Sequence, residues 1–320
     1  MAKSKRLLKS FLRLLLPIVV LSILALVPAS IWLVYATSRP NNVVYLVTPQ
    51  KYGQLSARAA QVTEESWTNN DGTKARGWLL RGEPGMPGVI LLHKYGADRS
   101  YTLNLGVKLS EGTNFTVLMP DERGHGENPL VPFTSFGGSE ADDVSAAIKF
   151  LQSLKAPDQG TLVGQDLGLY GVEMGALAAL SASAANTNIK MLVLDSMPQD
   201  SDAVLQSVVE KRFPFASSVT SSIAKLGTKM YYFDGSYQRT PPCEQARSIF
   251  DRKVLLLAGT DAPAYQDSTS KLSKCFPAGS STETKTDLSP SGYSIVNSSI
   301  EQADAYDQRV IDFFRQASGH

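Results

Sequence analysis

From residue 88 onward, short apolar runs alternate with longer segments of helical pattern, and this alternation constrains the fold more than any other feature. The apolar runs have the length of buried strands and lie at residues 88–92, 115–119, 167–170, 189–194 and 254–257. The segments of helical pattern lie at residues 139–154, 174–185, 241–250 and about 300–314. This order predicts a mostly parallel sheet with helices on both faces. With 320 residues and 43% hydrophobic content, one large α/β domain fits the chain better than two.

The N-terminal part carries a strongly apolar segment behind a basic one. Five Lys and Arg side chains in residues 1–13 precede an uncharged run at 14–36, and Trp32 and Tyr35 lie near its far end. As a helix this run would be about 34 Å long, enough to span a bilayer core. We therefore expect a transmembrane signal-anchor helix with a cytoplasmic N-terminus and an extracytoplasmic domain.

Residues 37–57 would then be a linker and residues 58–320 the folded domain. A cleaved signal peptide is the competing interpretation, because Val34-Tyr35-Ala36 resembles a cleavage site. The run is longer than most signal-peptide cores, which favours the uncleaved anchor. Residues 1–63 contain no acidic side chain, so the net charge of +1 hides an acidic domain, which argues against nucleic-acid binding.

The two cysteines, Cys243 and Cys275, either form a disulfide or stay free thiols, and the sequence leaves both possibilities open. Their spacing is not that of a metal site, and no other cluster has ligand spacing. We expect neither a metal nor a cofactor. We also expect the aromatic side chains near Phe213-Pro214-Phe215 and Tyr231-Tyr232-Phe233 to fill the core or pack loops rather than form a substrate wall.

Three glycine-containing motifs follow three predicted strands. His93-Lys94-Tyr95-Gly96-Ala97-Asp98-Arg99 follows the first, and Asp121-Glu122-Arg123-Gly124-His125-Gly126 the second. The third, Gly171-Val172-Glu173-Met174-Gly175, stands between a strand and an Ala/Leu-rich helix. It has the form of the G-x-S-x-G nucleophile elbow, with glutamate in the place of serine.

This order of motifs resembles the α/β-hydrolase fold, in particular its serine aminopeptidase-like and esterase-like members, over about residues 58–317. The resemblance implies an eight-stranded, mostly parallel sheet with helices on both faces. It also implies a lid between residues 195 and 251, which here has room for only two or three short helices.

The resemblance further implies where a catalytic site would lie. Glu173 stands at the nucleophile position, Asp261 at the acid position, and Tyr293 where histidine belongs. The backbone N–H groups of Tyr95 and Met174 would form the oxyanion hole. The chain has three histidines, and His93, His125 and His320 all lie elsewhere, so no general base remains.

Glu173 has two interpretations. At the first turn of a helix its carboxylate should be ionised, and Lys94, in the place of a glycine, could pair with it and fill the former site. Alternatively, Glu173 could act as a carboxylate nucleophile, as an aspartate does in the dehalogenases of this fold. That route needs a base, and a tyrosine, with an ordinary pKa near about 10, is a poor one.

Two classes of function remain. The chain is a membrane-anchored pseudo-hydrolase that binds an unknown small molecule or protein, or it is an esterase-, peptidase- or dehalogenase-like hydrolase with an altered mechanism.

Overall fold

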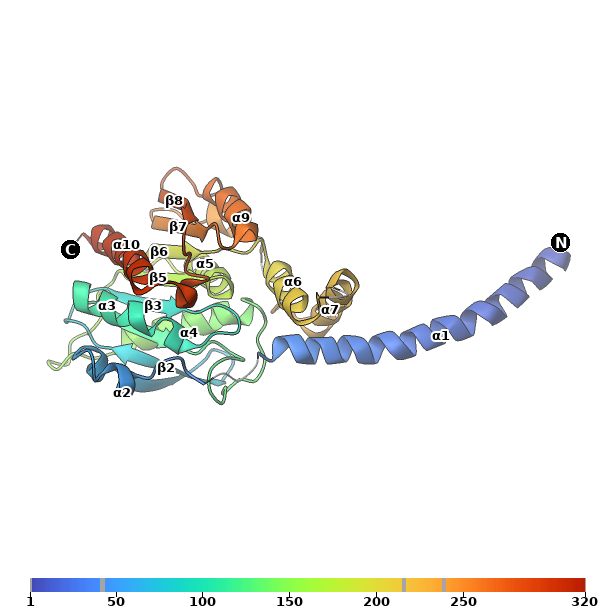
Figure 1. The fold of residues 1–320 in the computed structure, drawn as a ribbon, viewed down its shortest axis with the longest axis horizontal. Coiled ribbons are helices and arrows are strands. Elements are labelled where there is room, and N and C mark those ends of the chain that lie inside the picture. The colour runs from blue at the N-terminus through green and yellow to red at the C-terminus, as the bar shows by residue number, and fades with distance from the viewer. Residues whose placement is uncertain (1, 41–43, 215–216, 238–239, 320) are drawn as a thin grey trace.

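The computed structural model describes residues 2–40, 44–214, 217–237 and 240–319, without the side chains of residues 2–12 and 14. A long helix, α1 (Ala2–Ser38), extends away from an α/β domain whose sheet carries helices on both faces (Figure 1). Its segment Leu15–Ser38 is long and apolar enough to cross a membrane, with a mean hydropathy of 2.4. Helix α1 therefore has the composition expected of a signal anchor or single span.

The domain is built on one eight-stranded sheet in the order β1-β2-β4-β3-β5-β6-β7-β8. Strands β1 and β2 form an antiparallel hairpin, β2 also pairs antiparallel with β4, and the other strand pairs are parallel. The strands are β1 (Thr63–Thr68), β2 (Lys74–Leu80), β3 (Gly88–Leu92), β4 (Thr116–Pro120), β5 (Leu167–Val172), β6 (Ile189–Asp195), β7 (Lys253–Gly259) and β8 (Ser281–Leu288). The predicted fold class is confirmed.

Helices cover both faces of the sheet because alternate residues of each central strand point to opposite sides. In β3, Val89 and Leu91 pack with one cluster, whereas Ile90 and Leu92 pack with the other. Helices α3 (Leu103–Thr113) and α10 (Ile300–Ser318) cover the first face. Helices α4 (Ser139–Ser153), α5 (Met174–Ala185) and α8 (Pro242–Arg247) cover the second.

The linker and the edges add smaller elements. Helix α2 (Pro49–Tyr52) and the short helix η1 (Ala59–Gln61) precede β1, η2 (Arg99–Tyr101) precedes α3, and η4 (Ile295–Asn297) precedes α10. Helix α9 (Pro263–Ser273) lies between β7 and the edge strand β8. Cys243 and Cys275 form a disulfide that joins α8 to the chain just after α9, which settles the question that the sequence left open.

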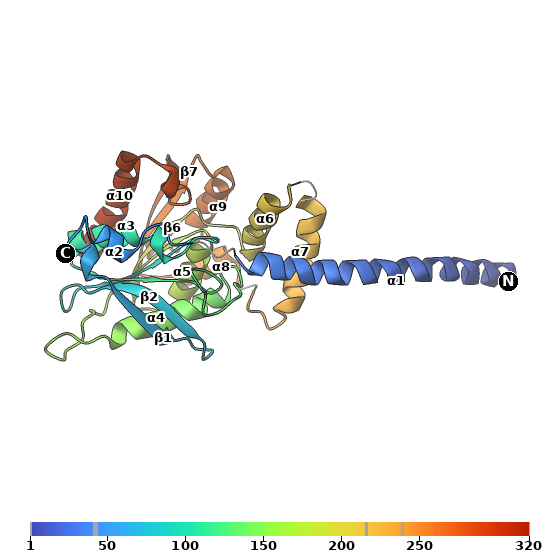
Figure 2. The same ribbon diagram turned by 60° about the horizontal axis from the view of Figure 1, so that its bottom comes forward.

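The lid between β6 and β7 is a pair of helices, α6 (Ser201–Arg212) and α7 (Ser217–Tyr231). Both project from the domain on the side from which α1 departs (Figure 1). In Figure 2, α7 runs across α1 rather than along it. The last turns of α1 pack into this region, where Leu33, Val34, Thr37 and Ser38 are buried.

Candidate functional site

The turn between β5 and α5 holds Glu173 in a strained backbone conformation. Its φ of 51° lies in the left-handed region, which non-glycine residues rarely adopt outside functional turns. The flanking glycines are required by close backbone contacts. A Cβ on Gly171 would lie 2.3 Å from the Gly175 carbonyl oxygen, and a Cβ on Gly175 would lie 2.6 Å from that of His93. The sharp elbow geometry is therefore present around a glutamate.

The Glu173 carboxyl group is buried and bonded at both oxygens. Glu173 is only 2% exposed to solvent. Oε2 accepts a hydrogen bond from the Tyr95 backbone N–H at 3.0 Å, and Oε1 accepts one from the Tyr265 hydroxyl at 2.7 Å. The carboxyl group of Glu173 therefore accepts the hydrogen bond of the Tyr95 N–H that was predicted to be a donor of the oxyanion hole.

Burial raises the pKa of Glu173, although the Tyr265 hydrogen bond, the charges of Lys211 and Lys94 and the Tyr95 N–H all oppose this shift. The expectation that the helix N-terminus keeps Glu173 ionised did not take the burial of its side chain into account. The sequence places the residue at the helix start, but it does not show that the side chain is removed from water, and this desolvation outweighs the helix dipole.

Lys94 does not make the predicted ion pair with Glu173. Its ammonium group donates to the backbone carbonyl oxygen of Tyr293 and lies 4.1 Å from the centre of the Tyr293 ring. Burial lowers the pKa of Lys94, and the charge of Glu173 partly opposes this effect. The predicted contact is wrong because the Glu173 oxygens already have donors and the Tyr293 carbonyl offers Lys94 another acceptor.

Tyr293 and Asp261, the two other predicted catalytic residues, have hydrogen-bond partners other than Glu173. The Tyr293 hydroxyl contacts the Lys211 ammonium, and its ring packs edge-on against Tyr265 with centroids 5.2 Å apart. Asp261 accepts hydrogen bonds from the backbone N–H and hydroxyl of Ser291 at 3.1 and 2.8 Å. Burial would raise the pKa of Asp261, but hydrogen bonds from Ser294 and Ser291 outweigh it and the pKa is lowered.

Both described histidines support the loops around the site. His93 contacts the Lys94 carbonyl through Nδ1 at 2.9 Å and accepts from the Glu122 N–H through Nε2 at 3.1 Å, which requires the neutral Nδ1–H tautomer. Burial is the main cause that lowers the pKa of His125 to about 3. His320 lies outside the described residues. Neither buried ring is placed to act as a base for Glu173.

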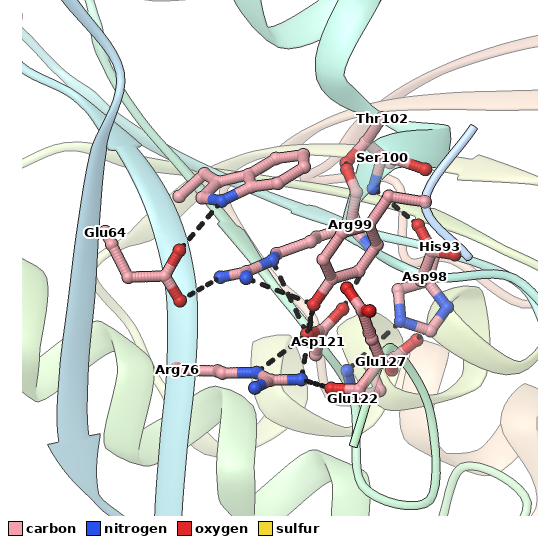
Figure 3. Close-up of polar contacts among 12 residues, drawn as sticks. Glu64, Arg76, His93, Asp98, Arg99, Ser100, Thr102, Asp121, Glu122 and Glu127 are labelled. Atoms are coloured by element: carbon pink, nitrogen blue, oxygen red, sulfur yellow. Dashed lines mark hydrogen bonds and ion pairs between the residues drawn. The ribbon is translucent and has the colours of Figure 1, made fainter. Parts of the chain in front are cut away.

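A charged network beside His93 ties the linker to the same loops (Figure 3). Asp121 accepts from the Arg76 Nε at 3.1 Å, from the Arg99 backbone N–H at 3.1 Å and from the Tyr45 hydroxyl at 2.9 Å. Arg99 also donates to Glu64 of β1 at 2.8 Å. The network gives Arg99 of the first motif and Asp121 of the second a structural role, because they hold the linker and β1 against the loops beside His93.

The C-terminal end of α1 contacts the loop after β3 that contains Tyr95, which we call the oxyanion loop. The Tyr95 hydroxyl donates to the Thr37 carbonyl at 2.6 Å, and the Thr134 N–H donates to the Ser38 carbonyl at 2.9 Å. Arg212 of the lid donates to the Ala36 carbonyl at 2.5 Å. Carbonyl groups at a helix end lack partners within the helix, and these donors supply them.

A cleft of about 1000 Å³ lies next to the site, between α6, α8 and α9. Tyr265 and Tyr293 line it together with Asp261. Tyr265 thus touches the cleft while its hydroxyl holds the buried Glu173. Within the described residues, no group of three or more His, Cys, Asp or Glu side chains is placed to bind a metal.

Comparisons with known proteins agree on the architecture. An esterase of Pyrococcus furiosus superposes with a TM-score of 0.65 at 20% identity, over 87% of this chain and 97% of that one. An enol-lactonase of Burkholderia xenovorans superposes with a TM-score of 0.51 at 21% identity, over 78% of this chain and 99% of that one. This chain has the α/β-hydrolase fold.

Sequence comparisons identify no closer relationship than the shared fold. No family model matches the chain. A thiohydrolase of Aspergillus aculeatus is 23% identical over 132 residues, which are 41% of this chain and 40% of that protein. The match thus spans less than half of this relative's length.

Within this α/β-hydrolase fold, sequence reasoning missed two residues of the site. Tyr265 lies on α9, a helix that the sequence pattern did not predict. Asp195, at the end of β6, is fully buried and accepts from the Gly292 N–H at 2.9 Å and the Tyr306 hydroxyl at 2.8 Å. Burial raises the pKa of Asp195. An acidic residue that ends an apolar strand was the available signal for Asp195.

Proposed function

We propose that this chain is a membrane-anchored α/β-hydrolase-fold protein without serine-hydrolase chemistry, which binds a small molecule or protein in the cleft beside Tyr265. The observation that carries this proposal is the state of Glu173. Its carboxyl group is buried, accepts hydrogen bonds at both oxygens and occupies the N–H of Tyr95 that an oxyanion would need. The residue at the nucleophile position therefore blocks the donor on which acyl transfer depends.

The membrane part of the proposal rests on α1. Its apolar segment Leu15–Ser38 follows a basic N-terminus, which favours a cytoplasmic N-terminus and an extracytoplasmic domain. The Cys243–Cys275 disulfide is consistent with an oxidising compartment. The contacts that Thr37 and Ser38 make with the domain favour an uncleaved anchor, because cleavage after Ala36 would remove the helix that orients them.

A fluorophosphonate probe tests the loss of serine chemistry, because it reacts covalently with activated serine side chains. We expect no labelling of the full chain in detergent. The double substitution Glu173→Ser with Tyr293→His is the matched control and is expected to gain labelling if these two positions are assigned correctly. A labelled serine in the unmodified protein would overturn the proposal.

One observation favours the alternative, a hydrolase that uses Glu173 as nucleophile. The residue keeps the strained elbow conformation, with φ at 51°, which presents a nucleophile in this fold. A carboxylate that attacks the carbon of a haloalkane displaces the halide ion and forms an ester. Water then attacks the ester carbonyl, which releases the alcohol and regenerates the carboxylate. Turnover of haloalkanes in ¹⁸O-labelled water would in that case place ¹⁸O in the Glu173 carboxylate. Peptide mass spectrometry detects this incorporation, and we expect none.

A further inference from the structure

The outer face of lid helix α7 carries an apolar stripe that the described part of the chain leaves exposed. Val219, Leu226 and Met230 are 64%, 63% and 69% exposed, and Phe233 just beyond the helix is 88% exposed. Their spacing places these side chains along one face of a helix. The expectation that the aromatic side chains of this region fill the core or pack loops is wrong for Phe233, which is exposed. Large apolar side chains gathered on one face mark an interaction surface.

The two edges of the stripe face different neighbours. On the polar edge, Lys225 donates to Gln206 at 2.8 Å and Lys229 pairs with Asp202 at 3.1 Å, and both partners belong to α6. On the opposite side, Gly227 packs against α1 so closely that a Cβ there would lie 2.1 Å from the Ser30 Oγ and 3.0 Å from a Val34 methyl group. The stripe therefore lies between the lysine edge and the surface of α1.

The contact with α1 fixes the level of α7 along the apolar segment. Ser30 and Val34 both lie within Leu15–Ser38, and Ser30 is about 12 Å from the Ser38 end of the helix. Because α7 crosses α1 (Figure 2), a bilayer spanned by α1 would contain α7 roughly in its plane. That is the position of an interfacial amphipathic helix.

Aromatic side chains from three segments gather at the same level. The Trp32 ring of α1 lies 5.3 Å from that of Phe213 in the lid. Tyr35 of α1 lies 6.3 Å from Phe133, and Phe133 lies 6.2 Å from Tyr231 at the end of α7. Tryptophan and tyrosine concentrate where a membrane protein crosses the membrane–water interface. This aromatic group points to the same level independently of the stripe.

The geometry points to a lipid bilayer as the partner of the stripe. We infer that α7 lies in the interface of the leaflet on the domain side, with Val219, Leu226 and Met230 among the acyl chains. The lysine edge then lies at the level of the lipid phosphates, where basic side chains are favoured. The inference rests on the proposed anchor and adds that the lid itself is a second membrane contact. The continuity of the stripe with the exposed surface of α1 favours lipid over a second copy of the chain.

Site-directed spin labelling of the full chain in lipid vesicles tests this inference. The native cysteines form a disulfide, so a label reacts with a single introduced thiol. Leu226→Cys and Met230→Cys report on the stripe. Leu24→Cys in α1 is the lipid reference, and Gln152→Cys on α4 is the water reference. All four positions are exposed, so the labels are tolerated. Collision rates with oxygen, which partitions into lipid, and with a water-soluble nickel chelate give the depth of each label.

We expect the labels at 226 and 230 to resemble the label at 24, with oxygen collisions exceeding those of the chelate, and the label at 152 to show the reverse. If the labels on the stripe match position 152 while position 24 remains in lipid, the inference is overturned and the anchor stands. If position 24 also lies in water, the anchor and the inference both fail. Low collision rates with both reagents at 226 and 230 would show that protein covers the stripe and would also overturn the inference.

Discussion

The carboxyl group of Glu173 is held by two donors that lie far from it in sequence. Tyr95 is 78 positions away and Tyr265 is 92 positions away. The motif around Glu173 predicted the elbow, and the resemblance to the α/β-hydrolase fold implied that Tyr95 lies close to it. It could not predict Tyr265, because that contact depends on how α9 packs. Nor could it predict that the Lys94 ammonium donates to the backbone carbonyl of Tyr293.

The raised pKa of Glu173 predicts a pH dependence of stability. Because the folded pKa lies above the unfolded value of about 4.3, the folded state binds more protons between the two, and stability falls as pH rises through the folded pKa. Glu173→Gln, which resembles the protonated carboxyl group, removes this component. We expect the unfolding free energy of the variant to fall less than that of the unmodified protein between about pH 5 and about pH 8.

Urea denaturation at both pH values measures this difference. Glu111→Gln, at an exposed glutamate of α3, is the matched control and should keep the pH dependence of the unmodified protein. An equal loss of stability in Glu173→Gln and the unmodified protein would contradict the role of burial at this residue.

The hydrogen bond from Tyr265 should contribute to stability in its own right. Tyr265→Phe leaves one buried Glu173 oxygen without its donor, which typically costs about 1–3 kcal/mol. Tyr293→Phe removes a hydroxyl that contacts the exposed Lys211, and this loss should cost much less. Chemical denaturation compares the two, and similar losses would show that the Tyr265 contact contributes nothing particular to the site.

At the scale of elements, patterning located the central strands well because each is a short apolar run buried on both faces. The edge strand β8 was less clear, since its side chains alternate between exposed and half-buried and all but Leu288 are polar. Helices α3 and α9 were missed because each has only 11 residues, and the glycines of α3 and the serines of α9 are more typical of loops. The close packing of α7 on α1 depends on Gly227, whose role is invisible until both helices are placed.

The disulfide between the α8 and α9 regions should stabilise this side of the cleft. Cys243 and Cys275 are 32 positions apart, and closing a loop of that length typically contributes about 2–4 kcal/mol. Replacing both with serine is expected to lower the unfolding free energy by that amount. Thermal unfolding of the oxidised protein with and without reductant gives the same comparison without substitution. An unchanged transition in both experiments would contradict the expectation.

For the whole molecule, the sequence predicted an anchor helix followed by an α/β-hydrolase fold, and the structure has a long apolar helix followed by that fold. What the sequence could not show is that the end of α1, the lid and the oxyanion loop form one packed unit. Tyr95 makes this connection, because its N–H binds Glu173 while its hydroxyl binds the end of α1. A site that is joined in this way to the apolar helix α1 and filled by its own glutamate supports the proposal of binding rather than turnover.

Hydrolytic turnover by the full chain is the measurement that tests this conclusion most directly. The substrates are short-chain esters, thioesters and amides, assayed with the unmodified protein and with Glu173→Ala. We expect no turnover of any substrate above the rate of the variant, because the carboxyl group of Glu173 is buried and neither described histidine is placed to act as its base. Turnover by the unmodified protein that disappears in Glu173→Ala would contradict the account.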